Sequence, residues 1–207
     1  MDVDPPYPFT STSSAAQAFV YVAPCHGEDW LKLGFSRDPL ARLQALHPRY
    51  FEFFDIDLAF AIETTTVREA RALETRFGRA LRHHGAPAPL TVMPAAGGHT
   101  EWYRGAYTWL AAAADTLAHE GFPIHRPLRP WLHDRLMAGA ELLYAWTALL
   151  PPDALQARGA ACRADAAQRR VADVLDAYRA AGIDLTRWLP ADVLDWHDAA
   201  SLYGPRR

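Results

Sequence analysis

Residues 18–46, AFVYVAPCHGEDWLKLGFSRDPLARLQAL, decide the predicted fold. Two short runs in this stretch, residues 19–23 and 30–35, are rich in β-branched and aromatic side chains. The polar segment between them contains Gly27 and has the composition of a hairpin turn. We therefore predict that the two runs form a pair of antiparallel strands.

A short helix is predicted directly after the second strand. Asp38 precedes a proline there, and this order favours a helix start, because Asp accepts free amide hydrogens and Pro suits the first helical position. The strands lead into this helix through Gly34. We expect the side chains of Tyr21, Lys32 and Arg42 to project toward the turn.

These motifs resemble those of the GIY-YIG nuclease superfamily. The first motif of that superfamily ends in a strand tyrosine, matched by Tyr21, and the second ends in a glycine, matched by Gly34. The helix arginine that follows matches Arg42, and the metal-binding glutamate of a later helix matches Glu74. The segment 101–103, Glu-Trp-Tyr, resembles the Glu-Trp-aromatic ending of a phage- and bacteria-associated subgroup.

Two positions depart from the superfamily pattern. Phe19 stands where the first motif opens with glycine, and Lys32 stands where the second motif has tyrosine. Lysine also occurs at the second position in the subgroup. Lys32 is, moreover, the only lysine among the 21 Lys and Arg residues of the chain. Either a compact ammonium group has a specific use at this position, or the single lysine is an accident of composition.

The resemblance implies an α+β fold, a small three-stranded antiparallel sheet flanked by helices, over residues 17–120. Residues 56–62 are the predicted third strand, with Leu58 on its apolar face. The predicted remainder is a disordered tail at 1–16, a linker at 121–130 and an all-helical domain at 131–207, because strand-like runs are confined to the first half.

Glu74 lies on a predicted helix that begins at Thr66. Ala70 and Phe77 form part of the apolar stripe of this helix, and Glu74 falls on the same side. A carboxylate at such a position needs a cation, a metal or hydrogen bonds, because an unpaired buried charge is costly. The two explanations are a salt bridge to an arginine such as Arg42 or Arg71 and a catalytic metal site.

The mechanism that the resemblance implies is metal-assisted hydrolysis of phosphodiester bonds. Glu74 would hold one divalent ion, Mg²⁺ or Mn²⁺. Tyr21 would act as general base, although a phenol needs a shifted pKa for that task. Arg42 would clamp the phosphate oxygens. Lys32 would depress the pKa of Tyr21 or contact a phosphate.

Further arginines and one histidine complete the predicted substrate site. Substrate-binding positions are predicted at Arg37, His47, Arg71 and Arg104. His47 follows Arg42 by about one turn, and the alternative for it is an ordinary helix-end histidine. The Glu74 helix region also carries the densest cationic stretch of the chain, which is either a solvated helix face or a strip that follows phosphates. That stretch consists of Arg68, Arg71, Arg76, Arg79 and Arg82.

Composition limits the possible functions. The formal net charge of −3 argues against a protein that coats nucleic acid broadly, while a local basic strip remains compatible with it. The chain has two cysteines and no signal-peptide pattern or long apolar run, so a cytoplasmic protein with no membrane partner is expected.

We therefore predict a DNA endonuclease, with DNA preferred over RNA as the partner. Two alternatives remain: a nucleic-acid-binding module that has lost cleavage, and an interaction protein that acts through its helical C-terminal domain.

Overall fold

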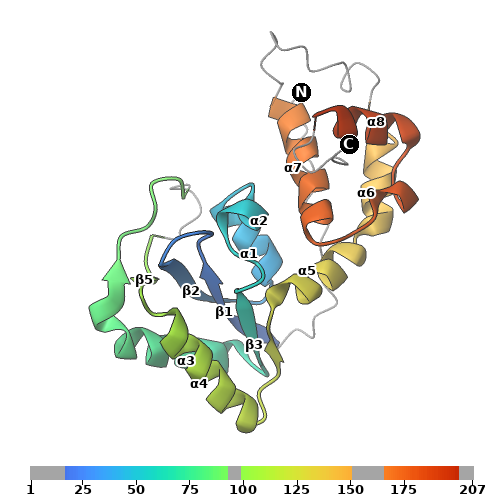
Figure 1. Cartoon of the computed structure of the whole chain (residues 1–207). Helices are drawn as coiled ribbons and strands as arrows, with labels where there is room; N and C mark the ends of the chain where they lie inside the picture. Colours follow the sequence, from blue (N-terminus) through green and yellow to red (C-terminus); the bar gives the residue numbers. More distant parts are fainter. Residues whose placement is uncertain (1–16, 93–98, 151–165, 201–207) are drawn as a thin grey trace. The chain divides into compact units, whose positions relative to one another are not determined.

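The computed structural model of the chain describes residues 17–92, 99–150 and 166–200 (Figure 1). The predicted tail at 1–16 lies outside these residues. The chain divides into two compact units, one that ends at Leu132 and one that begins at His133. In the described part of the chain, no helix has the length and apolar character needed to cross a membrane.

The first unit contains one antiparallel sheet, which confirms the predicted α+β class. Its long strands are β1 (Ala18–Pro24), β2 (Trp30–Ser36) and β3 (Phe60–Thr64). The β1–β2 hairpin is present, with Tyr21 opposite Gly34.

The sheet has six strands, so the prediction of three was incomplete. The additional strands are β4 (Gly85–Ala86), β5 (Trp102–Arg104) and β6 (Ile124–His125), and the strand order is β4-β5-β2-β1-β3-β6. Segments of two or three residues are too short to show the alternating pattern of a strand in the sequence. They are strands because they pair with a neighbouring strand in the sheet. β6 also lies within the predicted linker at 121–130.

The start of the third strand was predicted too early. Residues 55–59 form a turn, because the Asp55 carboxylate accepts hydrogen bonds from the backbone N–H groups of Asp57 and Leu58 at 3.0 Å each. Leu58, which was expected on the apolar face of the strand, is 47% exposed. β3 therefore begins only at Phe60.

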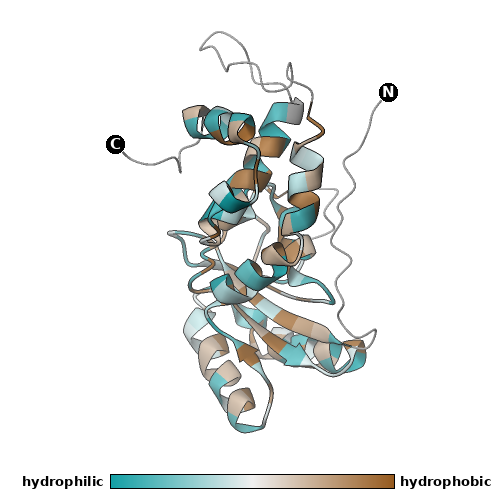
Figure 2. Ribbon diagram, turned by 90° about the vertical axis from the view of Figure 1, so that its right-hand side faces the viewer, coloured by the Kyte–Doolittle hydropathy of each residue, from teal (hydrophilic) through white to brown (hydrophobic). Residues whose placement is uncertain are grey.

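One face of the sheet is covered by two helices, α3 (Val67–Ala80) and α4 (Tyr107–His119) (Figure 1). Alternate residues of β1, such as Val20 and Val22, pack with Phe77 and Leu110 in the main hydrophobic core. The central strands accordingly carry apolar colour along much of their length (Figure 2). At the start of α3, the Thr66 hydroxyl accepts a hydrogen bond from the N–H of Glu69 at 3.1 Å.

The opposite face carries the residues that alternate with this core, among them Tyr21, Lys32 and Trp102. Helices α1 (Pro39–Leu46) and α2 (Tyr50–Phe53) belong to this side, since Phe54 at the end of α2 stacks on Trp102 with ring centroids 6.3 Å apart. α1 begins as predicted, because the Asp38 carboxylate accepts from the N–H of Ala41 at 3.1 Å.

Helix α5 (Leu128–Met137) begins in the first unit, and the second unit is helical wherever it is described. Its elements are α6 (Ala140–Thr147), α7 (Ala166–Ala180), the 3₁₀ turn η4 (Leu185–Arg187) and α8 (Ala191–Ala200). A buried pair joins α8 to α7, with His197 Nε2 2.8 Å from a carboxylate oxygen of Asp176. The predicted domain boundaries themselves stay a prediction.

Candidate functional site

Tyr21 lies at the centre of the candidate site, on β1, the strand between β2 and β3 in the sheet. Its side chain is 1% exposed, and its ring lies directly against the backbone of Gly34 on β2. A Cβ atom at position 34 would sit 2.5 Å from the Tyr21 hydroxyl oxygen and 2.7 Å from Cζ. The second motif therefore needs glycine because the tyrosine ring occupies the space of a side chain.

Arg42 reaches the same hydroxyl from α1. Asp38 caps this helix, and the backbone N–H of Arg42 donates to the Asp38 carbonyl at 3.1 Å, which places Arg42 in the first turn. Its guanidinium is hydrogen-bonded to the Tyr21 hydroxyl. Burial raises the pKa of Tyr21 to about 12, although the charge and the hydrogen bond of Arg42 act to lower it.

Lys32 is a buried ammonium group, 2% exposed, on the same face of the sheet as Tyr21. Its Nζ donates to the carbonyls of Leu33 and Thr100 at 2.8 Å each and to a Glu101 carboxylate oxygen at 3.3 Å. These contacts use all three donors of the ammonium. Burial lowers the pKa of Lys32, while the charge of Glu101 acts to raise it.

Glu101 is a component of the site to which the sequence prediction gave no role. It is a non-glycine residue with a positive φ of 58°, and its backbone carbonyl accepts from the N–H of Leu33 at 3.1 Å. Its carboxylate also accepts a hydrogen bond from the Thr100 hydroxyl at 2.5 Å. The unusual backbone turns the Glu101 side chain back toward Lys32. The Glu-Trp-Tyr motif was the available sequence signal.

Glu74 reaches the site from α3, at the edge of β2 that β5 leaves uncovered. β5 pairs with β2 only as far as Lys32. Beyond it, the backbone N–H groups of Leu33 and Phe35 point toward the side of β5, and that of Leu33 donates to the Glu101 carbonyl. The half-buried Glu74 carboxylate accepts the hydrogen bond of the Phe35 N–H. The backbone of β2 thus holds Glu74 at this strand edge.

The electrostatic couplings show that the four predicted catalytic residues come together. Burial raises the pKa of Glu74, and the negative charge of Glu101 raises it further, whereas Lys32 lowers it. The charges of Glu74 and Arg42 likewise act on Tyr21 and on Lys32. Tyr21, Lys32, Arg42 and Glu74 therefore share one electrostatic environment.

Two of the four predicted substrate-binding residues, Arg71 and Arg37, lie near the end of β2. Arg71 is exposed on α3 one turn before Glu74, its charge lowers the pKa of Glu74, and its guanidinium lies 5.4 Å from the centroid of the Phe35 ring. Arg37 is exposed in the short connection between β2 and α1. Both are positioned beside the end of β2 that carries the site.

The other two have different surroundings. The His47 ring stacks on Phe53 with centroids 4.6 Å apart and accepts a hydrogen bond from the N–H of Arg49 at 3.2 Å, so it serves the end of α1. Arg104 pairs with Asp29 at 2.9 Å and lies 4.3 Å from the ring centroid of Trp30. Because Trp30 opens β2, Arg104 lies about 16 Å along the strand from Phe35.

The carboxylates of the site determine which metal ion it could bind. No group of three or more His, Cys, Asp or Glu side chains able to hold a metal occurs within residues 17–92, 99–150 and 166–200. Glu74 and Glu101 nevertheless place two carboxylates in one environment. Magnesium commonly binds one or two protein carboxylates and completes its shell with waters and phosphate oxygens. The donor chemistry therefore fits such an ion.

A family model matches part of the chain. No curated protein and no solved structure matches the chain. Residues 18–118, from the start of β1 to the last turn of α4, match the family model of the T5orf172 domain, and this region contains every residue of the candidate site.

Proposed function

We propose that this protein is a metal-dependent endonuclease that hydrolyses phosphodiester bonds of DNA. The observation that carries the proposal is the hydrogen bond between the buried Tyr21 hydroxyl and Arg42, with the Glu74 charge acting on the same phenol. The T5orf172 domain is nuclease-like, and the motifs around Tyr21, Gly34, Arg42 and Glu74 resemble those of the GIY-YIG superfamily.

Arg42 and Tyr21 would act together on the phosphate and the attacking water. The guanidinium of Arg42 would bind phosphate oxygens and stabilise the negative charge that grows in the transition state. The Tyr21 oxygen would accept the proton of the water. Because burial raises the pKa of Tyr21 to about 12, this step requires more positive charge near the phenol than Arg42 alone supplies.

Glu74 would hold the divalent ion, Mg²⁺ or Mn²⁺, with Glu101 as the nearby second carboxylate. When bound, such an ion polarises the scissile phosphate and stabilises the departing oxygen. Burial and the charge of Glu101 raise the pKa of Glu74, so the negative charge of this carboxylate is disfavoured at its position. A bound cation would relieve this cost.

Lys32 would act as a positioning residue. Its three donors are occupied by Leu33, Thr100 and Glu101, so the ammonium ties the segment before β5 to β2. In this role Lys32 holds the Glu101 carboxylate near Glu74 and leaves the phosphate to Arg42.

The test is cleavage of supercoiled plasmid with magnesium by the wild type, Glu74→Ala and Glu69→Ala. Glu69 lies on the same helix and serves its N-terminus, since its carboxylate accepts from the N–H of Thr65 at 2.9 Å. Glu74→Ala should lose about 100-fold or more in rate, a loss typical of removing a transition-state contact. Glu69→Ala should cleave at the wild-type rate with a slightly lower midpoint of unfolding.

A second readout does not depend on activity. Magnesium should raise the melting temperature of the wild type and of Glu69→Ala, because a ligand that binds only the folded state stabilises it. It should leave Glu74→Gln unchanged. Equal cleavage by wild type and Glu74→Ala would reveal a contaminating nuclease and refute the proposal.

The second candidate function is nucleic-acid binding without cleavage. Two observations favour it: the pKa of about 12 for Tyr21, and the use of Lys32 as a buried structural cation where the superfamily has tyrosine. Under this alternative, plasmid stays supercoiled with magnesium or manganese, yet the protein still shifts it on a gel.

A further inference from the structure

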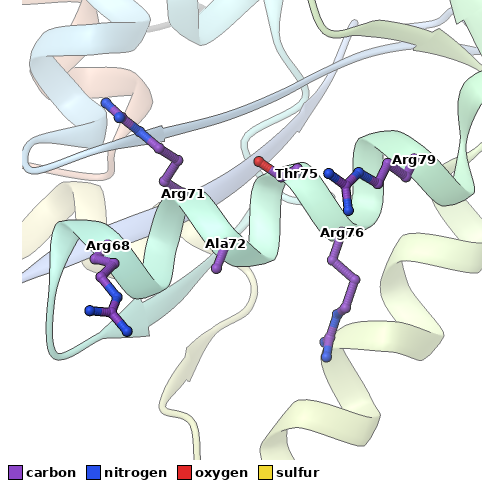
Figure 3. A pocket seen from close by; sticks show the side chains of 6 residues that line it. All are labelled: Arg68, Arg71, Ala72, Thr75, Arg76 and Arg79. Carbon is purple, nitrogen blue, oxygen red and sulfur yellow. The ribbon is translucent and has the colours of Figure 1, made fainter.

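The outer face of α3 carries four exposed arginines. Arg68, Arg71, Arg76 and Arg79 follow one another along the helix, on the side opposite the core residues Ala70 and Phe77 (Figure 3). A hollow of about 540 Å³ lies over this face, lined by the four arginines together with Ala72 and Thr75. We call this surface the α3 arginine face.

None of these four arginines forms a salt bridge within the described parts of the chain, and the helix explains why. α3 contains only two acidic residues. The Glu69 carboxylate accepts from the backbone and the hydroxyl of Thr65, and the Glu74 carboxylate accepts from the backbone of Phe35. Both acids are therefore committed to other groups, and neither forms an ion pair with the arginine face.

An ordinary solvated helix places opposite charges three or four residues apart, where they attract. The α3 arginine face does the reverse. Arg68 and Arg71 are three residues apart, and so are Arg76 and Arg79. Pairs of like charge at this spacing destabilise a helix unless an anion lies across them. In a chain with a net charge of −3, such a concentration of positive charge indicates an anionic partner.

We propose that the α3 arginine face binds the phosphate backbone of the DNA that the candidate site would cleave. An α-helix rises 1.5 Å per residue, so the face is about 16 Å long between Arg68 and Arg79. One strand of B-form DNA presents about five phosphates over that length. Arg71 joins the face to the site, because its charge acts on Glu74. The proposal rests on the proposed function for the identity of the polymer.

The test removes two charges that lie away from the site. Arg68→Gln/Arg79→Gln changes two exposed arginines and leaves Arg71 in place. The matched control, Arg169→Gln/Arg187→Gln, also removes two exposed arginines, from the second unit. Binding of a fluorescein-labelled DNA duplex is measured by anisotropy in EDTA, which prevents cleavage, between about 50 and 200 mM salt.

Loss of two phosphate contacts should reduce the slope of log K against log salt by about 1.8, which weakens binding by roughly 10- to 60-fold at 0.1 M salt. The control pair should bind with nearly the wild-type slope. Equal slopes for the wild type and the α3 variant would overturn the proposal, and so would an equal loss in both variants. A third outcome would also overturn the proposal. If the α3 variant binds the DNA duplex like the wild type but no longer binds vesicles of anionic lipid, the arginine face binds a membrane instead.

The cleavage and binding assays together distinguish failure of this proposal from failure of the proposed function. If the wild type cleaves plasmid and the α3 variant binds duplex like the wild type, the arginine face is not the binding surface and the endonuclease stands. If no protein cleaves but the α3 variant loses binding, the arginine face stands and the endonuclease does not.

Discussion

Replacing Gly34 by alanine tests the contact on which the candidate site is built. The added Cβ would lie 2.5 Å from the hydroxyl oxygen of Tyr21 and 3.0 Å from Cε1. Favourable contacts between carbon atoms begin at about 3.5 Å, so the overlap approaches 1 Å. Tyr21 is 1% exposed and hydrogen-bonded to Arg42, so its ring cannot adopt another rotamer without disturbing its neighbours.

The magnitude follows from two opposing effects. Overpacking of a buried site costs about 1–3 kcal/mol. Replacing glycine by alanine restricts the unfolded chain and returns about 0.4–1 kcal/mol. We expect a net loss of about 1.3 kcal/mol in the free energy of unfolding for Gly34→Ala, the difference between these two effects. Gly85→Ala, in β4, is the matched control, because the nearest atom to its Cβ would be 3.7 Å away.

The assay is urea unfolding of a double-mutant cycle, followed by circular dichroism and tryptophan fluorescence. In a Tyr21→Leu background the ring is gone, so Gly34→Ala should cost almost nothing or stabilise slightly. The coupling between the two substitutions should therefore be about 2 kcal/mol. An equal cost of Gly34→Ala with and without the Tyr21 ring would refute the reasoning.

Three further predictions concern the groups around this contact. Lys32→Met should destabilise the protein by roughly 2–4 kcal/mol in urea unfolding, because it removes the donor to the buried Leu33 carbonyl and to the partly buried Thr100 carbonyl; a variant as stable as the wild type would contradict this structural role. Glu74→Gln should be more stable than the wild type at pH 7 and equal to it below about pH 4: a raised carboxyl pKa means that the folded state holds the proton more tightly, so wild-type stability falls as pH rises between the unfolded and folded pKa values. A difference in melting temperature between Glu74→Gln and the wild type that does not change with pH would contradict this. Asp38→Ala should lower stability by about 1 kcal/mol through loss of the α1 cap, and it should weaken any cleavage, since α1 positions Arg42; unchanged melting and cleavage would show that the cap is dispensable.

The sequence predicted the elements whose signals are local. β1 and β2 were predicted from β-branched and aromatic runs and α1 from the Asp38 cap, and all three are present. The start of β3 was missed because the Asp55 turn overrides the apolar pattern around Leu58. The prediction did not place β4, β5 and β6 in the sheet, because their pairing depends on partner strands that are distant in the chain.

The candidate site was predictable in its members and not in their environments. The positions of Tyr21, Arg42 and Glu74 follow from motif spacing. Burial of Lys32 could not be foreseen, since lysine is almost never fully buried unless paired, and its acceptors at residues 100 and 101 are remote in sequence. Glu101 was quoted as part of a motif, but its positive φ and its contact with Lys32 are features of the folded backbone that the motif does not show.

The burial of Lys32 makes the protein a natural reporter of its own local opening. Lys32 is the only lysine of the chain, so it supplies the only side-chain amine, and that amine is 2% exposed and held by three acceptors. An amine-selective acylating reagent can modify it only in molecules in which the segment before β5 has separated from β2. The rate of acylation at this one position therefore measures the free energy of that opening, and ligands that close the site should slow it.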